Sequence, residues 1–80
     1  MPNQNDAIRR KNAHRIAFDY LERQVAKMPA FASAEKFWQQ ACDEVTELGN
    51  QHDDELTRQL LITEYFELER IWKAERSDSA

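Results

Sequence analysis

Glycine, proline and cysteine are scarce in this chain of 80 residues, which contains one glycine, two prolines and one cysteine. Sandwiches and barrels of short β-strands need frequent turn residues, so this scarcity argues against them and favours helices. The single cysteine, Cys42, excludes an internal disulfide, and we interpret it as a small buried hydrophobic residue. Two scattered histidines add no spacing typical of a zinc site. The sequence therefore predicts no metal and no cofactor.

Long hydrophobic runs are also missing. No run approaches the roughly 18 apolar residues of a membrane-spanning helix, and no charged-then-apolar leader opens the chain. Hydrophobic residues make up 41% of the sequence and charged residues 32%, which is typical of a folded soluble domain. We expect a single helical domain over residues 1–80 that is cytoplasmic and has no membrane partner.

Charge is unevenly distributed along the chain. Residues 1–30 carry a formal charge of +3 and residues 31–80 carry −7, which gives the net charge of −4. Nucleic-acid-binding domains are usually basic throughout, and the basic run at residues 9–15 (RRKNAHR) spreads its cations around a helix. We therefore predict no nucleic-acid partner, and expect the basic segment to attract acidic regions of the same or another copy.

The spacing of apolar residues predicts three helices, at about residues 5–28, 34–48 and 53–76, with a frayed tail at 77–80. The connections between them are short, so neighbouring helices must run antiparallel. The predicted fold class is all-α, an up-down-up three-helix bundle in which the first and third helices are long and the second is shorter.

Helix boundaries are predicted from capping residues. Pro29 disfavours continuation of the first helix, and Ser33 is a favourable N-cap for the second. Gly49 stands where a left-handed C-terminal cap is expected, and Asp53 or Asp54 is expected to cap the third helix. The expected buried face of the first helix consists of Ala13, Ala17, Tyr20, Leu21, Gln24 and Met28.

The segment LLITEYFELERIW, residues 60–72, holds more apolar residues than one helical face can bury. Ile62 and Phe66 fall opposite the main apolar face, so they either are wrapped within the fold or meet another molecule. Ile71 and Trp72 lie on turns expected to extend past the second helix, unless Met28 and Phe31 cover them. We therefore predict a homodimer through the third helix, with candidate interface residues Ile62, Phe66, Ile71, Trp72 and Phe31.

Glu64 falls within the main apolar face of the third helix. A buried carboxylate needs a partner, and we expect a salt bridge or hydrogen bond to the first helix. The candidate partners are Arg15, Tyr20, Arg23 and Lys27.

Two acid pairs, Glu44 with Glu47 and Glu64 with Glu67, occupy i, i+3 positions on consecutive helices. Their spacing resembles the ExxE and ExxD pairs of MazG-type all-α nucleotide pyrophosphohydrolases, over about residues 44–67. The resemblance implies Mg²⁺ held against a nucleotide triphosphate, although the last acid here is Glu67 where the family has aspartate. Whether these acids converge on a metal is open at this point.

The function predicted from the sequence is that of a small acidic helical module that binds protein, with a regulatory role and no enzymatic activity. Two alternatives stay open. One is the magnesium-dependent hydrolase that the acid pairs imply. The other is an inhibitor of phage or mobile-element type, whose acidic surface occupies the nucleic-acid groove of a nucleic-acid-binding protein.

Overall fold

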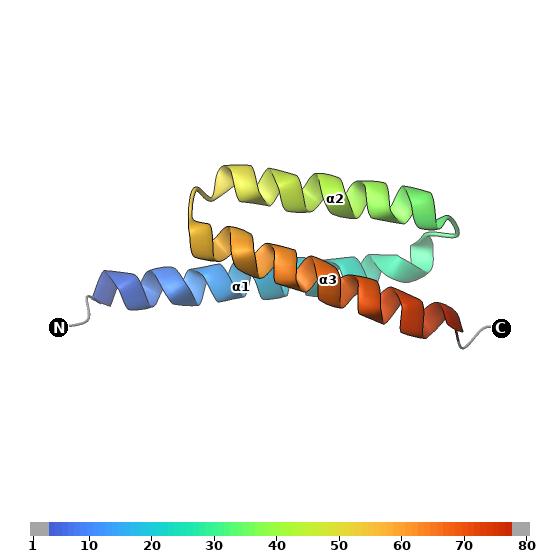
Figure 1. Cartoon of the computed structure of the whole chain (residues 1–80), viewed down its shortest axis with the longest axis horizontal. Helices are drawn as coiled ribbons and strands as arrows, with labels where there is room; N and C mark the ends of the chain where they lie inside the picture. Colours follow the sequence, from blue (N-terminus) through green and yellow to red (C-terminus); the bar gives the residue numbers. More distant parts are fainter. Residues whose placement is uncertain (1–3, 78–80) are drawn as a thin grey trace.

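The computed structural model of the chain describes residues 4–77, which form three α-helices joined by short connections. α1 spans Gln4–Lys27, α2 spans Ala34–Gln51 and α3 spans Glu55–Ser77, and a 3-10 turn, η1, covers Met28–Ala30. In Figure 1, α1 and α3 run in the same direction and α2 runs antiparallel to both. The predicted all-α three-helix bundle with a shorter second helix is confirmed.

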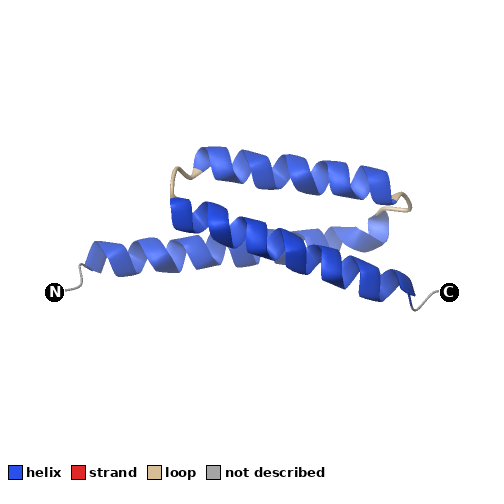
Figure 2. Ribbon diagram, viewed as in Figure 1, coloured by secondary structure: helices blue, strands red, loops and turns tan. Residues whose placement is uncertain are grey.

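The bundle is elongated, with principal extents of 54 × 22 × 16 Å. The first turns of α1 extend well past one end of α2, whereas α3 ends only slightly past its other end (Figure 2). α1 and α3 pack most extensively against each other. Within the described residues, no helix is both long enough and apolar enough to cross a bilayer.

Side-chain caps fix where α2 and α3 begin. The Ser33 hydroxyl accepts a hydrogen bond from the Lys36 N–H at 3.3 Å, as an N-cap should. Asp54 Oδ2 accepts hydrogen bonds from the N–H and the hydroxyl of Thr57, at 3.0 and 2.9 Å. α3 therefore begins one residue after Asp54. Of the tail predicted at 77–80, Ser77 closes α3 and residues 78–80 lie outside the described part.

The predicted end of the second helix at residue 48 is wrong, because α2 continues to Gln51. Gly49 keeps helical geometry, and no described residue adopts a positive φ angle. The last turn closes when the His52 N–H donates to the Leu48 carbonyl at 3.0 Å. His52 then leaves the helix in an extended conformation, so no left-handed cap is needed.

The core lies between the three helices and includes the whole face predicted for the first helix, of which Met28 belongs to η1. All six of its residues are buried: Ala13, Ala17, Tyr20, Leu21, Gln24 and Met28. α2 contributes Phe37 and Ala41, both fully buried. Because α2 turns Phe37 and Ala41 towards the core, Cys42 faces outwards. The expectation that Cys42 is buried is therefore wrong. Burying Phe37 removes far more apolar surface from water than burying a thiol does.

Candidate functional site

Ile62 and Phe66 project from α3 on the side away from α1 and keep most of their surface in contact with solvent. Their exposed fractions are 55% and 63%. Within the part of the chain that the structure describes, the other exposed large hydrophobic residues are Ile8 and Phe18. These two residues lie on α1, whereas Ile62 and Phe66 lie on α3. Ile62 and Phe66 are therefore not wrapped by their own chain.

A shallow groove of about 260 Å³ lies beside Ile62, between α2 and α3. The walls of the groove include the apolar residues Val45, Leu61 and Ile62. Gly49 lines the groove on the α2 side, where it has no side chain to fill the space. Its size suits one side chain better than a drug-sized ligand, since small-molecule sites usually exceed about 300 Å³. The remaining lining residues are Thr46, Asn50 and Arg58.

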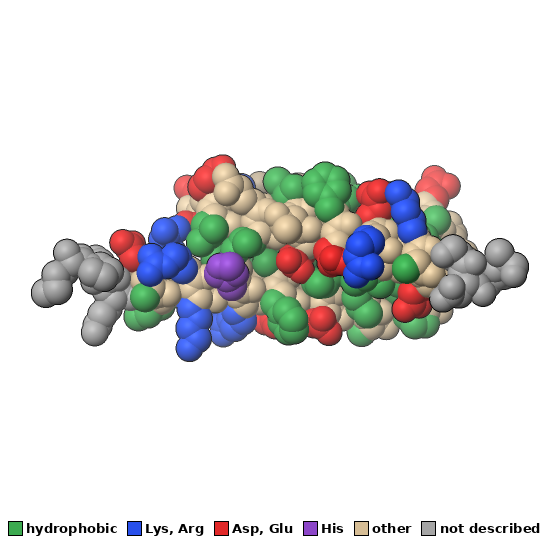
Figure 3. Space-filling model, turned by 60° about the horizontal axis from the view of Figure 1, so that its bottom comes forward, with side chains coloured by type: hydrophobic (Ala, Val, Ile, Leu, Met, Phe, Trp, Pro, Cys, Tyr) green, Lys and Arg blue, Asp and Glu red, His purple; other side chains and the backbone are tan. Residues whose placement is uncertain are grey.

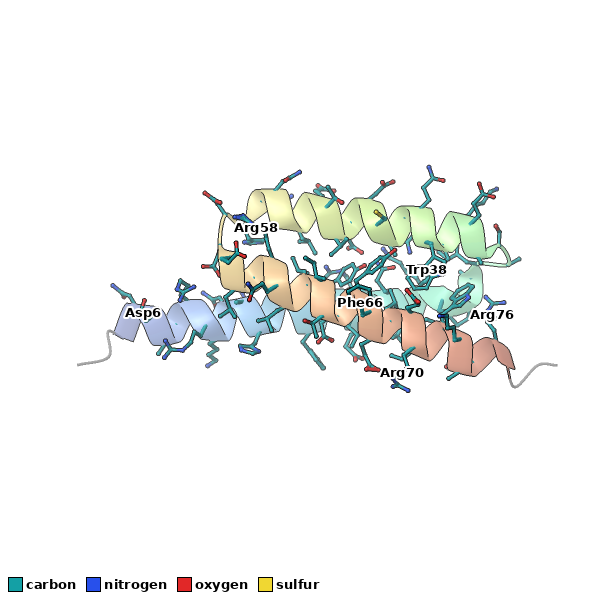
Figure 4. All side chains as sticks on the ribbon, in the orientation of Figure 1. Asp6, Trp38, Arg58, Phe66, Arg70 and Arg76 are labelled. Atoms are coloured by element: carbon teal, nitrogen blue, oxygen red, sulfur yellow. The ribbon has the colours of Figure 1, made fainter. Side chains whose placement is uncertain are left out.

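Aromatic side chains extend this apolar region along the two helices. The Phe66 ring lies 6.3 Å from the Tyr65 ring, and Tyr65 lies 5.4 Å from Trp38 of α2, centroid to centroid. Figure 4 shows Trp38 between α2 and α3 and Phe66 on the middle turns of α3. We call Trp38, Val45, Ile62, Tyr65 and Phe66 the α2–α3 surface. Ile62 and Phe66 are exposed, and Trp38, Val45 and Tyr65 are half-buried.

A second group, Phe31, Ile71 and Trp72, packs in an aromatic cluster at the end of the bundle. Trp38 joins this cluster to the α2–α3 surface, since its ring lies 6.0 Å from that of Trp72. Trp72 is only 8% exposed, because its ring stacks on Phe37 at 4.4 Å and the Arg76 guanidinium lies 4.0 Å over it. The expectation that Trp72 is uncovered is therefore wrong. Phe31 and Ile71 pack half-buried against the same cluster, so these three residues stabilise the fold.

The acid that joins the helices is Glu44, and Glu64 does not have this role. Glu44 accepts hydrogen bonds from Gln24 and from Arg23 Nε, the latter at 3.1 Å, and Lys27 Nζ lies 3.6 Å away. Glu64 is half-exposed and has no ion pair within residues 4–77. The predicted partners Arg23 and Lys27 thus bind a carboxylate of α2, and the assignment to Glu64 is wrong.

The contacts around Glu44 form a polar network that the sequence pattern did not indicate. The buried Gln24 side chain donates to Glu44 and accepts from Gln40, which also donates to the Phe37 carbonyl. Nearby, the Tyr20 hydroxyl donates to the Ala41 carbonyl at 2.9 Å. Burial, and then the charge of Glu44, raise the pKa of Tyr20 well above its ordinary value, so it remains a donor. A glutamine inside an otherwise apolar face was the available signal.

Three of the four acids in the two pairs contact different partners, and Glu64 has no ion pair within residues 4–77. Glu47 accepts a hydrogen bond from Gln51 at 3.2 Å and Glu67 pairs with Arg70, while Glu44 faces α1. Across residues 4–77, no three histidine, cysteine or acidic side chains gather closely enough to hold a metal ion. The geometry therefore offers no convergence of the pairs Glu44/Glu47 and Glu64/Glu67.

Basic side chains gather over the N-terminal half of α1 (Figure 3). Arg9 is paired with Asp54 at 2.6 Å, which ties the first turns of α1 to the start of α3. Arg10, Lys11 and Arg15 are exposed and form no ion pair with a described residue. This end of α1 is the positive part of an otherwise acidic molecule.

No protein family, no curated protein and no solved structure matches this chain. The resemblance of the acid pairs to MazG-type enzymes thus gains no support from these comparisons.

Proposed function

We propose that this chain is a small helical protein-binding module with a regulatory role, and that it self-associates as a homodimer through α3. The observation that carries the proposal is the α2–α3 surface, on which Ile62 and Phe66 remain exposed beside half-buried aromatic residues. Contiguous exposed apolar surface of this kind typically marks an interaction site in a soluble protein.

The energetics of a chain this small favour such an association. A domain of about 80 residues has a core that supplies only a few kcal/mol of net stability. Two-fold pairing buries the same apolar surface on both copies at once. At roughly 25 cal/mol per Å² of apolar area, covering two phenylalanine and two isoleucine side chains adds burial that the monomer lacks.

The test is sedimentation velocity of the wild type, Phe66→Glu and Phe18→Glu at micromolar concentration. Phe18 is the matched control, because it is 58% exposed against 63% for Phe66 but lies on α1. We expect the wild type and Phe18→Glu to sediment as dimers and Phe66→Glu as a monomer. Circular dichroism should show all three equally helical, since both positions are exposed.

A wild type that sediments as a monomer throughout the micromolar range would contradict self-association. A Phe66→Glu variant that stays dimeric would contradict the assignment of the interface to α3.

A further inference from the structure

Six residues of α3 lie on one face at alternating intervals of four and three positions. This is the heptad spacing with which two helices pack along a shared seam. Five of the six side chains are exposed and one, Glu69, is half-buried. We call them the α3 seam: Glu55, Gln59, Ile62, Phe66, Glu69 and Lys73.

The α3 seam is self-complementary about position 64. Ile62 and Phe66 lie two positions either side of it, and Gln59 and Glu69 lie five positions either side. Glu55 and Lys73 lie nine positions away, or about 13 Å along the axis at 1.5 Å per residue. In an antiparallel pair centred at this position, apolar side chains therefore meet at the middle and opposite charges meet at both ends.

We propose that the occupant of the α3 seam is the α3 seam of a second copy, antiparallel and related by a two-fold axis that crosses the seam between Ile62 and Phe66, on the face of α3 opposite the Glu64 side chain. This inference rests on the proposed self-association and specifies its geometry. A parallel pair would set Glu55 against Glu55 and Lys73 against Lys73, and like charges repel at such distances. A surface for an unrelated partner has no reason to be complementary to itself.

The groove beside Ile62 supports the same arrangement. Antiparallel pairing places Phe66 of one copy opposite Ile62 of the other, next to the groove walls Val45 and Leu61. Gly49 lies inside a helix, where glycine is unfavourable, yet a Cβ there would meet only the Arg58 side chain, at 3.7 Å. The fold itself does not require this glycine, whereas an entering phenylalanine ring gains room from it.

Charged seam residues are already paired within the monomer, but weakly. Lys73 Nζ lies 3.0 Å from Glu69, and Gln59 Nε2 donates to Glu55 at 3.2 Å. Exposed pairs of this type contribute little to stability. Lys73 can therefore turn towards Glu55 of the second copy at small cost.

The experiment is a charge exchange, measured as the dimer dissociation constant by sedimentation equilibrium. Each single change, Glu55→Lys or Lys73→Glu, replaces two attractive end pairs with two repulsive ones and should weaken the dimer about tenfold. The double variant Glu55→Lys/Lys73→Glu should regain wild-type affinity, and an equimolar mixture of the two single variants should form heterodimers. The matched control is Glu22→Lys, an exposed acid of α1, which should leave the constant unchanged.

The outcomes separate this inference from the proposed function. If the wild type dimerises and Phe66→Glu does not, but both single charge variants keep wild-type affinity, the antiparallel seam is wrong and self-association stands. If the double variant stays as weak as the singles, the pairing of Glu55 with Lys73 is also wrong. If the wild type does not dimerise, both proposals fail.

Discussion

The Glu44 carboxylate holds α2 against α1 through three contacts with side chains of α1. Its partners are Gln24, Arg23 and Lys27, and its own side chain is 24% exposed. Gln24 is fully buried, so removing Glu44 takes away the carboxylate to which its amide N–H donates. An unsatisfied buried donor is more costly than a lost surface contact.

We therefore predict that Glu44→Ala lowers the free energy of unfolding by about 1–3 kcal/mol. Glu64→Ala, the matched change at a half-exposed acid without an ion pair, should stay within about 0.5 kcal/mol of the wild type. Urea denaturation at one fixed protein concentration measures both values. Equal destabilisation by the two variants would contradict the assignment of the helix-joining role to Glu44.

The sequence offered four candidate partners on α1, of which two, Arg23 and Lys27, bind an acid, but that acid is Glu44 and not the predicted Glu64. Glu64 is the acid that the sequence favours for this contact, because it falls in the apolar face of α3, whereas Glu44 stands out only as one member of the pair Glu44/Glu47. Which flank of α2 faces α1 depends on how that helix rotates to bury Phe37. That rotation is a tertiary packing effect, so local spacing does not contain it.

Asp54 connects elements in two ways, because it caps α3 and also binds Arg9 of α1. Hydrogen bonds from Thr57 and then Arg9 hold the pKa of this carboxyl below its ordinary value of 3.8. A group whose pKa is lowered by folding stabilises the native state above its unfolded pKa. That contribution is lost as the pH falls through the folded pKa.

We accordingly predict a stability difference between the wild type and Asp54→Asn that is present at about pH 6 and shrinks as the pH falls below 3.8. Asparagine can still cap the helix, so the difference reports the charge. Urea denaturation across this range provides the measurement. A difference that is the same at both ends of the range would contradict the account.

At the element scale, the sequence predicted the number, type and order of the helices but misplaced the end of α2. The capping roles of Ser33 and Asp54 could be predicted from the sequence, because a cap acts on N–H groups within three residues of itself. Gly49 suggested a left-handed cap by its residue type alone, yet nothing in the following segment requires a positive φ angle. The helix instead continues to Gln51, and Gly49 opens the groove beside Ile62.

Over the whole molecule, the candidate interface residues divide between two regions. Phe31, Ile71 and Trp72 belong to the aromatic cluster at the bundle end, where Phe37 and Arg76 cover Trp72 from two sides. Ile62 and Phe66 remain on the α2–α3 surface. The sequence predicted that the turns carrying Ile71 and Trp72 extend past α2, and this is wrong, because Phe37 in the first turn of α2 stacks on Trp72.

The central claim is that copies of this chain meet through the α2–α3 surface, and a dilution series of ¹H–¹⁵N NMR spectra tests it most directly. Gly49 is the only glycine of the chain, so its amide resonance is simple to assign. On dilution from the dimer to the monomer, we predict that the amide signals of Gly49, Ile62 and Phe66 shift together while that of Phe18 stays constant. Shifts confined to Phe18 and its neighbours on α1, or no shift anywhere, would contradict the claim.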